Sequence, residues 1–203
     1  MERVTYDDLE PLVRALHEGH TVAIPTDTVY GVACAAHLPD ACERLLRAKG
    51  RPPAQPTAIV GGTVESALDV VLPELPAAAR ERARRLLPGP VTLILPNPGR
   101  RYAWLCGDEP ERIGLRVPEL HPQLAAAIDR VGALLLTSAN RAGEPPARAF
   151  EDLEAVAAIA HVALDGGTCP GGAPSTVVDV CGDDPVIVRE GPVSLDELRA
   201  RLA

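Results

Sequence analysis

Two cations stand at the end of a predicted helix, in Leu46-Arg47-Ala48-Lys49-Gly50-Arg51-Pro52-Pro53. Of the 20 lysine and arginine side chains in the chain, 19 are arginine, and Lys49 is the one lysine. A mobile ammonium beside a planar, fork-shaped guanidinium suits a polyanion such as a phosphate chain. A lysine near a helix C-terminus is also favoured by the helix dipole, so the spacing alone leaves a purely structural role open.

Hydrogen-bonding side chains follow two predicted strands. The segment Pro25-Thr-Asp-Thr-Val-Tyr-Gly31 comes directly after the apolar run Thr21–Ile24, and Thr137-Ser-Ala-Asn140 ends the apolar run Ala133–Leu136. In open α/β sheets, ligands collect at strand ends, where hydroxyls and free backbone N–H groups converge. A plain turn is the alternative for the first segment. The repeated pattern favours a polar binding site at these strand ends.

Three arginines, Arg51, Arg116 and Arg189, stand at segment ends or inside apolar runs. Arg116, in the strand-like run 113–118, must either pair with a carboxylate in the core or face an anionic ligand. The chain has neither G-x-x-x-x-G-K-[ST] nor G-x-G-x-x-G, and its glycine-rich loop 165–174 fits neither pattern. These arginines, Lys49 and the strand-end polar groups suit an anionic nucleotide held beside a zwitterionic small molecule.

The elements that must position these groups are apolar strands and amphipathic helices, which together indicate an α/β fold. Leu9, Leu12, Val13 and Leu16 predict a helix that Thr5 caps. Further helices are predicted at 39–49, after Thr63, at 77–87, 121–131 and 153–159, and after the capping box Ser194-x-x-Glu197; strands are predicted at 21–24, 57–60, 91–95, 113–118, 133–136 and 175–180. Residues 96–112 show no periodicity and are expected to form a loop.

Composition narrows the class of protein. The chain has 203 residues, of which 46% are hydrophobic and 24% charged, as is ordinary for a soluble globular protein. No apolar run approaches a membrane span and residues 1–20 lack a signal-type apolar core, so a single α/β domain over residues 1–203 in the cytoplasm is expected. Five widely spaced cysteines without a C-x-x-C pair predict free thiols rather than disulfides or a zinc site.

Charge and aromatic content argue against broad nucleic-acid binding. The net charge is −8 and aromatic residues make up 2% of the chain, so neither a basic surface nor a stacking platform is well supplied. The one dense basic run is Arg80, Arg82, Arg84 and Arg85. We interpret it as the solvated face of a helix rather than as a nucleic-acid patch.

Seven motifs, in this order, resemble those of the YrdC/TsaC family. They are Pro-Thr-Asp-Thr-Val-Tyr-Gly (25–31), Ala-Lys-Gly-Arg-Pro (48–52), Pro-Gly-Pro-Val-Thr-Leu (88–93), Leu-Arg-Val-Pro (115–118), Ser-Ala-Asn (138–140), Pro-Ser-Thr-Val-Val-Asp (174–179) and Arg-Glu-Gly (189–191). The resemblance spans roughly residues 8 to 200 and is to the short form without an extra C-terminal domain. It implies a twisted mixed α/β sheet flanked by helices, with a concave, charged cavity.

The resemblance also implies an activity, that of an L-threonylcarbamoyladenylate synthase. This nucleotidyltransferase forms threonylcarbamoyl-AMP and pyrophosphate from L-threonine, bicarbonate and ATP. Partner proteins, the tRNA threonylcarbamoyl-transferases, then use the product to modify the adenosine beside the anticodon of certain tRNAs. Mg²⁺ is expected to arrive on the ATP phosphates, with no metal site made by the protein itself.

The motifs carry residue roles with them. By this resemblance, Lys49 and Arg51 hold the phosphates and stabilise the leaving pyrophosphate. Ser138 and Asn140 lie near the α-phosphate and bicarbonate. Tyr30 and Arg189 are expected at the nucleotide. Thr28, Arg116 and Ser175 are expected at L-threonine.

One position departs from the family pattern. Many members have a histidine that contacts threonine just after the strand corresponding to 57–60, where this chain has Gly61 and Gly62. Either backbone and water replace that contact, or the acceptor amino acid differs. A related enzyme that makes another carbamoyl-adenylate, from carbamoyl phosphate or another amino acid, is therefore one alternative, and a double-stranded RNA-binding module with weak RNA contact is another.

Overall fold

The computed structural model describes residues 1–52, 55–141, 143–171 and 173–203, so Pro53 of the cationic stretch and Gly172 of the glycine-rich loop lie outside it. Its strands are β1 (Glu2–Val4), β2 (Val22–Ile24), β3 (Gly31–Ala35), β4 (Ile59–Val60), β5 (Val91–Pro96), β6 (Arg112–Arg116), β7 (Leu134–Ser138), β8 (Val162–Leu164), β9 (Thr176–Asp179) and β10 (Val186–Arg189). Its helices are α1 (Glu10–His17), α2 (Pro39–Ala48), α3 (Val64–Ser66), α4 (Ala77–Leu86), α5 (Pro122–Val131) and α6 (Leu195–Leu202), with a π-helical turn at Ala67–Val71 and 3-10 helices at Ala103–Leu105 and Phe150–Val156.

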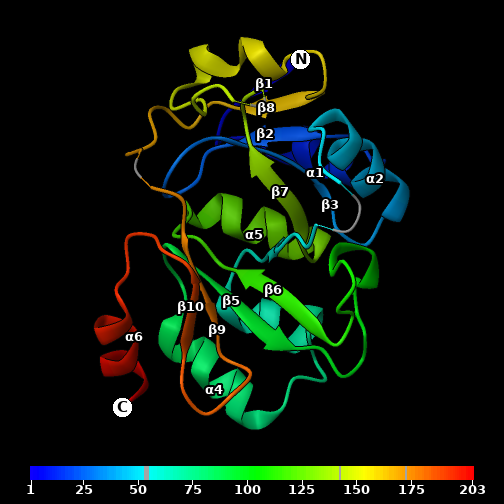
Figure 1. Cartoon of the computed structure of the whole chain (residues 1–203). Coiled ribbons are helices and arrows are strands. Elements are labelled where there is room, and N and C mark those ends of the chain that lie inside the picture. Colours follow the sequence, from blue (N-terminus) through cyan, green and yellow to red (C-terminus); the bar gives the residue numbers. More distant parts are fainter. Residues whose placement is uncertain (53–54, 142, 172) are drawn as a thin grey trace.

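Within the described residues, the strands form one ten-stranded sheet in the order β1-β8-β2-β3-β7-β4-β6-β5-β9-β10. The sheet contains parallel pairs, such as β4/β6 and β5/β9, and antiparallel pairs, such as β3/β7 and β5/β6, which confirms the predicted mixed α/β sheet. Figure 1 shows the sheet running from β1 and β8 at one end of the molecule to β9 and β10 at the other, with the helices around it.

Strand β3 lies near the middle of the sheet, yet the sequence patterns did not predict it. All five of its residues are buried. Val32 and Cys34 pack in the core cluster that includes α2, whereas Ala33 and Ala35 pack in the cluster formed with α1 and α5. A strand covered on both faces has no polar side, so the period-2 alternation that marks a half-buried strand is absent.

The other half of the sheet does alternate, and its alternation builds the floor of a cavity. In β5 and β6, Leu93 and Leu115 pair across the strands and pack into the core. Their neighbours Thr92 and Arg116 pair with each other and face the opposite side of the sheet, into the cavity described below. Because side chains alternate across a strand, an apolar core on one face leaves the other face free for polar groups.

Three helix-start signals are confirmed, and two other expectations were wrong. Pro39 occupies the first turn of α2, Thr63 accepts a hydrogen bond from the backbone of Ser66, and Ser194 accepts one from Glu197. The predicted cap Thr5 does not cap α1, because the helix starts five residues later, at Glu10, whose N–H is taken by the Asp8 carboxylate. Residues 150–156 form a 3-10 helix where a helix at 153–159 was expected.

The arginine-rich helix α4 is less solvated than expected. Arg80 donates to the carbonyl of Leu68 at 2.6 Å, and Arg82 donates to that of Val180 at 2.9 Å. Arg85 reaches a carbonyl near the C-terminus. These guanidinium groups therefore join neighbouring elements to α4 and do not form a free basic surface.

All five cysteines are free. In the part of the chain that the structure describes, no helix combines the length and the apolar character that crossing a membrane requires.

Candidate active site

A cavity of about 1060 Å³ lies against the face of the sheet opposite the α4 core. It extends from the end of β7 to the strands β5, β6 and β9. Every residue proposed from the motifs lines it: Thr28, Tyr30, Lys49, Arg51, Arg116, Ser138, Asn140, Ser175 and Arg189. Residues 161 positions apart in the sequence therefore share one concave, cationic site, as the resemblance implied.

Lys49 reaches the cavity because α2 ends in a Schellman motif. Gly50, with φ +63°, turns the chain, and the N–H groups of Gly50 and Arg51 bond back to the carbonyls of Arg47 and Leu46, each at 3.0 Å. A residue with positive φ after the helix end is where glycine is favoured. The turn places the ammonium next to the end of β7.

The Lys49 ammonium holds the end of β7. It donates to the carbonyl of Ser138 at 2.8 Å, to the side-chain oxygen of Asn140 at 3.0 Å and to the Asn140 carbonyl. The Ser138 hydroxyl donates to the same side-chain oxygen at 2.7 Å, and the Asn140 amide donates to Glu144 at 2.7 Å. We call Lys49, Ser138 and Asn140 the lysine end of the cavity.

Burial and neighbouring positive charges lower the pKa values of three cations that line the cavity. Burial, followed by the charge of Arg51, lowers the pKa of Lys49. Burial also lowers the pKa of Arg51, with Arg189 contributing, and the pKa of Arg116 falls for the same two reasons against the opposing effect of Asp27. A bound anion would relieve this repulsion, so the site is electrostatically prepared for one.

The loop between β2 and β3 meets Arg116. The Thr26 hydroxyl donates to the Val29 carbonyl at 2.7 Å and lies 3.1 Å from the Thr28 hydroxyl, which fixes the turn. One terminal nitrogen of Arg116 donates to Thr28 at 3.4 Å and to the Asp27 carboxylate. The first alternative for Arg116, a carboxylate partner, is therefore confirmed, and Arg116 also lines the cavity. Asp27, Thr28 and Arg116 are called the Arg116 cluster below.

Ser175 and Arg189 form the third part of the site. The buried Ser175 hydroxyl lies 2.8 Å from the Thr92 hydroxyl, and Arg189 donates to the Ser175 carbonyl at 2.7 Å and to its hydroxyl at 3.2 Å. The antiparallel pairing of β9 with β10 brings the start of one strand beside the end of the other. The two residues are thus positioned together.

Tyr30 is placed differently from the other cavity residues. Its side chain is fully buried, and its hydroxyl donates to Gly167 and accepts from Gly166, at 2.9 and 3.0 Å. Burial raises its pKa to about 12, so the hydroxyl stays protonated at physiological pH. Tyr30 therefore lines the cavity from a buried position and anchors the glycine-rich loop there.

No role was predicted for residues 96–112, yet this segment lines one part of the cavity. Asn97 organises it by donating to the carbonyls of Arg101 and Pro110, both at 2.9 Å. The segment supplies Leu105, Cys106, Asp108 and Glu109 to the cavity lining. Side-chain to backbone bonds of this kind produce no hydrophobic period. The one available signal was that asparagine is scarce, since the chain has only Asn97 and Asn140.

The glycine pair after β4 lies against the helices rather than in the cavity. A methyl group on Gly62 would come within 2.1 Å of the Ala125 carbonyl oxygen in α5, and one on Gly61 within 2.9 Å of Ala67. Gly61 also donates its N–H to Arg116 at 3.0 Å. These contacts explain why this chain has no larger side chain at either position.

Gly62→Ala is expected to lower the free energy of unfolding by about 1 to 3 kcal/mol, because the added methyl group overpacks against the backbone of α5. Gly182→Ala is the matched control, since nothing lies within 4 Å of its added methyl group. Urea unfolding of both variants checks the prediction. Equal stability of Gly62→Ala and the wild type would contradict the close contact.

A comparison with protein families matches residues 14–191 to the Sua5/YciO/YrdC family model, which is described as "Telomere recombination". The chain belongs to this family. A Sua5/YciO/YrdC protein of Mycobacterium tuberculosis named "Putative threonylcarbamoyl-AMP synthase" is 35% identical over 188 residues, covering 92% of this chain and 85% of that protein. The threonylcarbamoyl-AMP synthase of Chromohalobacter salexigens is 36% identical, covering 87% and 94%.

A solved structure supports the same relationship. Sua5 of Pyrococcus abyssi complexed with L-threonine superposes with a TM-score of 0.84 at 30% identity. The match covers 98% of this chain and 60% of that one, so this chain spans about three fifths of that Sua5. The family likeness therefore extends through nearly the whole fold described above.

Proposed function

We propose that the protein is an L-threonylcarbamoyladenylate synthase, a transferase that converts L-threonine, bicarbonate and ATP into threonylcarbamoyl-AMP and pyrophosphate for tRNA modification. The observation that carries the proposal is the presence of the lysine end and the Arg116 cluster in one cavity. Relatives of similar length bear this activity in their names, and the related Sua5 was solved with L-threonine. These relatives do not favour a carbamoyl phosphate enzyme or an RNA-binding module.

The phosphates of ATP are assigned to the cations around the lysine end. Lys49 and Arg51 bind the β- and γ-phosphates and stabilise the pyrophosphate as it leaves, while Ser138 and Asn140 contact the α-phosphate and bicarbonate. Arg189 binds the nucleotide, and Tyr30 contributes by positioning the glycine-rich loop. Lys49 and Arg51 are half-buried, and burial and neighbouring cations lower the pKa of each, which supports this assignment to the triphosphate.

L-Threonine is assigned to the other part of the cavity. Arg116 donates to its carboxylate, and the hydroxyls of Thr28 and Ser175 lie near its polar groups. Only one terminal nitrogen of Arg116 bonds to the described residues, so the other is left to donate to a substrate carboxylate, which supports this assignment. Neither Gly61 nor Gly62 is needed for this contact.

The chemistry requires positioning and charge stabilisation more than a nucleophilic side chain. The threonine amine attacks the carbon of bicarbonate and water leaves, giving N-carboxythreonine. A carboxylate oxygen of that carbamate then attacks the α-phosphorus in line with the departing pyrophosphate. Preorganised cations that contact the leaving phosphates lower this barrier. Mg²⁺ enters with ATP as part of the MgATP substrate.

The product is an acyl-adenylate that we assign to downstream tRNA threonylcarbamoyl-transferase proteins. No surface is assigned to tRNA, because the arginines of α4 are already bonded to carbonyls and carboxylates.

Mass spectrometry of the product tests the proposal. With MgATP, L-threonine and ¹³C-bicarbonate, the wild-type protein should form threonylcarbamoyl-AMP carrying one ¹³C, and omission of threonine should abolish it. A product formed from carbamoyl phosphate, or none from bicarbonate, would contradict the assignment.

The lowered pKa of Lys49 gives a pH prediction. The ammonium must be charged to bind phosphate, and its lowered pKa means that it loses the proton at a lower pH than an ordinary lysine. The kcat/KM for ATP should therefore fall at a pH below the usual lysine range. Bound ATP favours the charged form, so kcat should fall at a higher pH than kcat/KM. If kcat and kcat/KM fell at the same alkaline pH, a role for Lys49 at the phosphates would be contradicted.

A further inference from the structure

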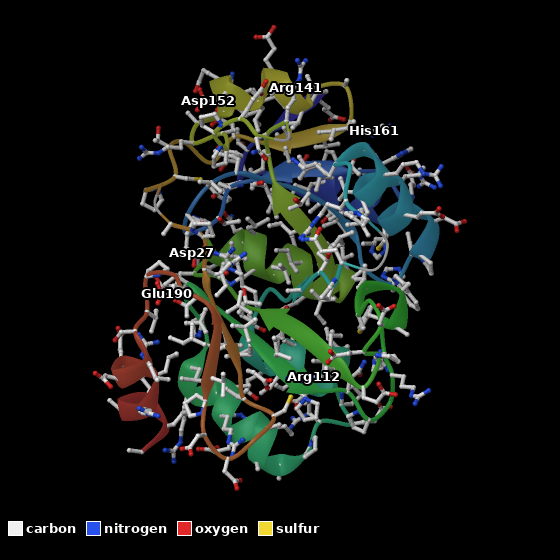
Figure 2. All side chains as sticks on the ribbon, viewed as in Figure 1. Asp27, Arg112, Arg141, Asp152, His161 and Glu190 are labelled. Atoms are coloured by element: carbon white, nitrogen blue, oxygen red, sulfur yellow. The ribbon has the colours of Figure 1, made fainter. Side chains whose placement is uncertain are left out.

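Asp27 and Arg116 form an ion pair that is almost completely buried, with exposed side-chain fractions of 11% and 13%. One carboxylate oxygen of Asp27 accepts from Arg116, and the other accepts from the backbone N–H of Glu119 at 3.3 Å. Asp27 thus connects the loop after β2 to the loop after β6. In Figure 2, Asp27 lies toward the arrowhead end of β6, whereas Arg112 lies lower, toward the start of that strand.

Asp27 contacts Arg116 from outside the cavity lining. Arg116 lines the cavity, whereas Asp27 is not among the described residues that do so. The pair also leaves the Nε–H of Arg116 buried and without a partner in the described chain. Both hydrogen bonds of the guanidinium use the same terminal nitrogen, and its other terminal nitrogen makes none to the described residues, which leaves donors for a planar carboxylate.

The ion pair also changes the distribution of charge in the cavity. Among the described residues, Lys49, Arg51 and Arg189 have no carboxylate in an ion pair, whereas the charge of Arg116 is compensated by Asp27. A triphosphate, with several negative charges, is drawn most strongly to cations whose charge no carboxylate compensates. A compensated guanidinium attracts it weakly but can still make short, directional hydrogen bonds to a monocarboxylate.

We infer that Asp27 separates the two anionic substrates within the cavity: it positions Arg116 and cancels its charge, so that an amino-acid carboxylate, and not a phosphate chain, binds there. The inference rests on the proposed function and extends it to a residue that contacts neither substrate. Asp27 is thus a positioning residue that determines which anion each part of the cavity accepts.

Isothermal titration of the full chain with L-threonine and with inorganic pyrophosphate tests the inference. In the wild type, saturating pyrophosphate should leave the affinity for threonine within about twofold, because the two ligands occupy different cations. In Asp27→Asn, threonine should bind about tenfold or more weakly, and pyrophosphate should now compete with it. The KM for threonine should rise in parallel, with the KM for ATP little changed.

Controls separate positioning from a general loss of structure. Asp129→Asn removes another carboxylate that ties two segments together, through the backbone and hydroxyl of Thr63, and should change neither affinity. Asp27→Glu keeps the negative charge and should keep pyrophosphate from competing. Competition in the wild type, or an equal loss of both ligands in Asp27→Asn, would overturn the inference, and the wild-type titration decides this even if that variant does not fold.

The two proposals fail in different ways. If the wild type binds threonine and pyrophosphate independently but forms no threonylcarbamoyl-AMP, the proposed function is wrong and the separation of anions stands. If it forms the product and Asp27→Asn still excludes pyrophosphate from Arg116, the proposed function stands and the role of Asp27 is wrong.

Discussion

Replacing Lys49 by alanine should lower the rate of pyrophosphate formation by about 100-fold or more, the range seen when a donor to transition-state charge is removed. Its ammonium is the one lysine charge in the chain, and it lies where Ser138 and Asn140 meet the cavity. Lys49→Arg should also lower the rate of pyrophosphate formation, because a planar guanidinium cannot reproduce a compact ammonium bonded to three oxygens. Wild-type rates in Lys49→Arg would contradict this argument.

The control for this variant must account for the structural contacts of Lys49, which holds the end of β7. Arg47→Ala removes a neighbouring cation that pairs with Glu43 on the exposed surface of α2, and it should leave turnover unchanged. Thermal unfolding of both variants shows how much of any loss comes from the fold. Near-normal pyrophosphate release by Lys49→Ala would exclude the Lys49 ammonium from the chemistry.

Arg116→Ala should lower the free energy of unfolding by about 3 kcal/mol or more, because it leaves the Asp27 carboxylate buried without its partner. The same variant should lose measurable threonine binding. Urea unfolding measures the first effect and isothermal titration the second.

A double variant and a surface control sharpen this prediction. Asp27→Asn combined with Arg116→Gln removes both charges, so it should be more stable than Arg116→Ala while still failing to bind threonine. Arg130→Ala breaks an exposed ion pair with Glu10 and should cost less than about 1 kcal/mol. Equal losses for Arg116→Ala and Arg130→Ala would contradict the buried pair.

Much of this architecture could be predicted from the sequence. The mixed α/β fold followed from strands and helices with clear periodicity, and the caps at Thr63 and Ser194 were read correctly. The nine site residues came from motifs, which fix residue type without geometry, and the fold brings all nine to one cavity. Their individual roles remain proposals.

The remainder depended on tertiary contacts that no local pattern encodes. β3 is buried on both faces and so lacks alternation, although its apolar run after Gly31 was a usable signal. Thr5 was assigned as a cap because it precedes an amphipathic run, but the chain turns before the helix begins and Asp8 takes the N–H instead. Asp27 stood inside a recognised motif, and its importance appears only when β6 brings Arg116 beside it.

The proposed synthase activity is best tested by measuring pyrophosphate release from the purified wild-type protein with MgATP. Release is measured with L-threonine and bicarbonate present together and with each omitted. Serine in place of threonine and carbamoyl phosphate in place of bicarbonate serve as comparisons, and Lys49→Ala measures the background. Release should require both L-threonine and bicarbonate. Release with carbamoyl phosphate or serine alone, or no release at all, would contradict it.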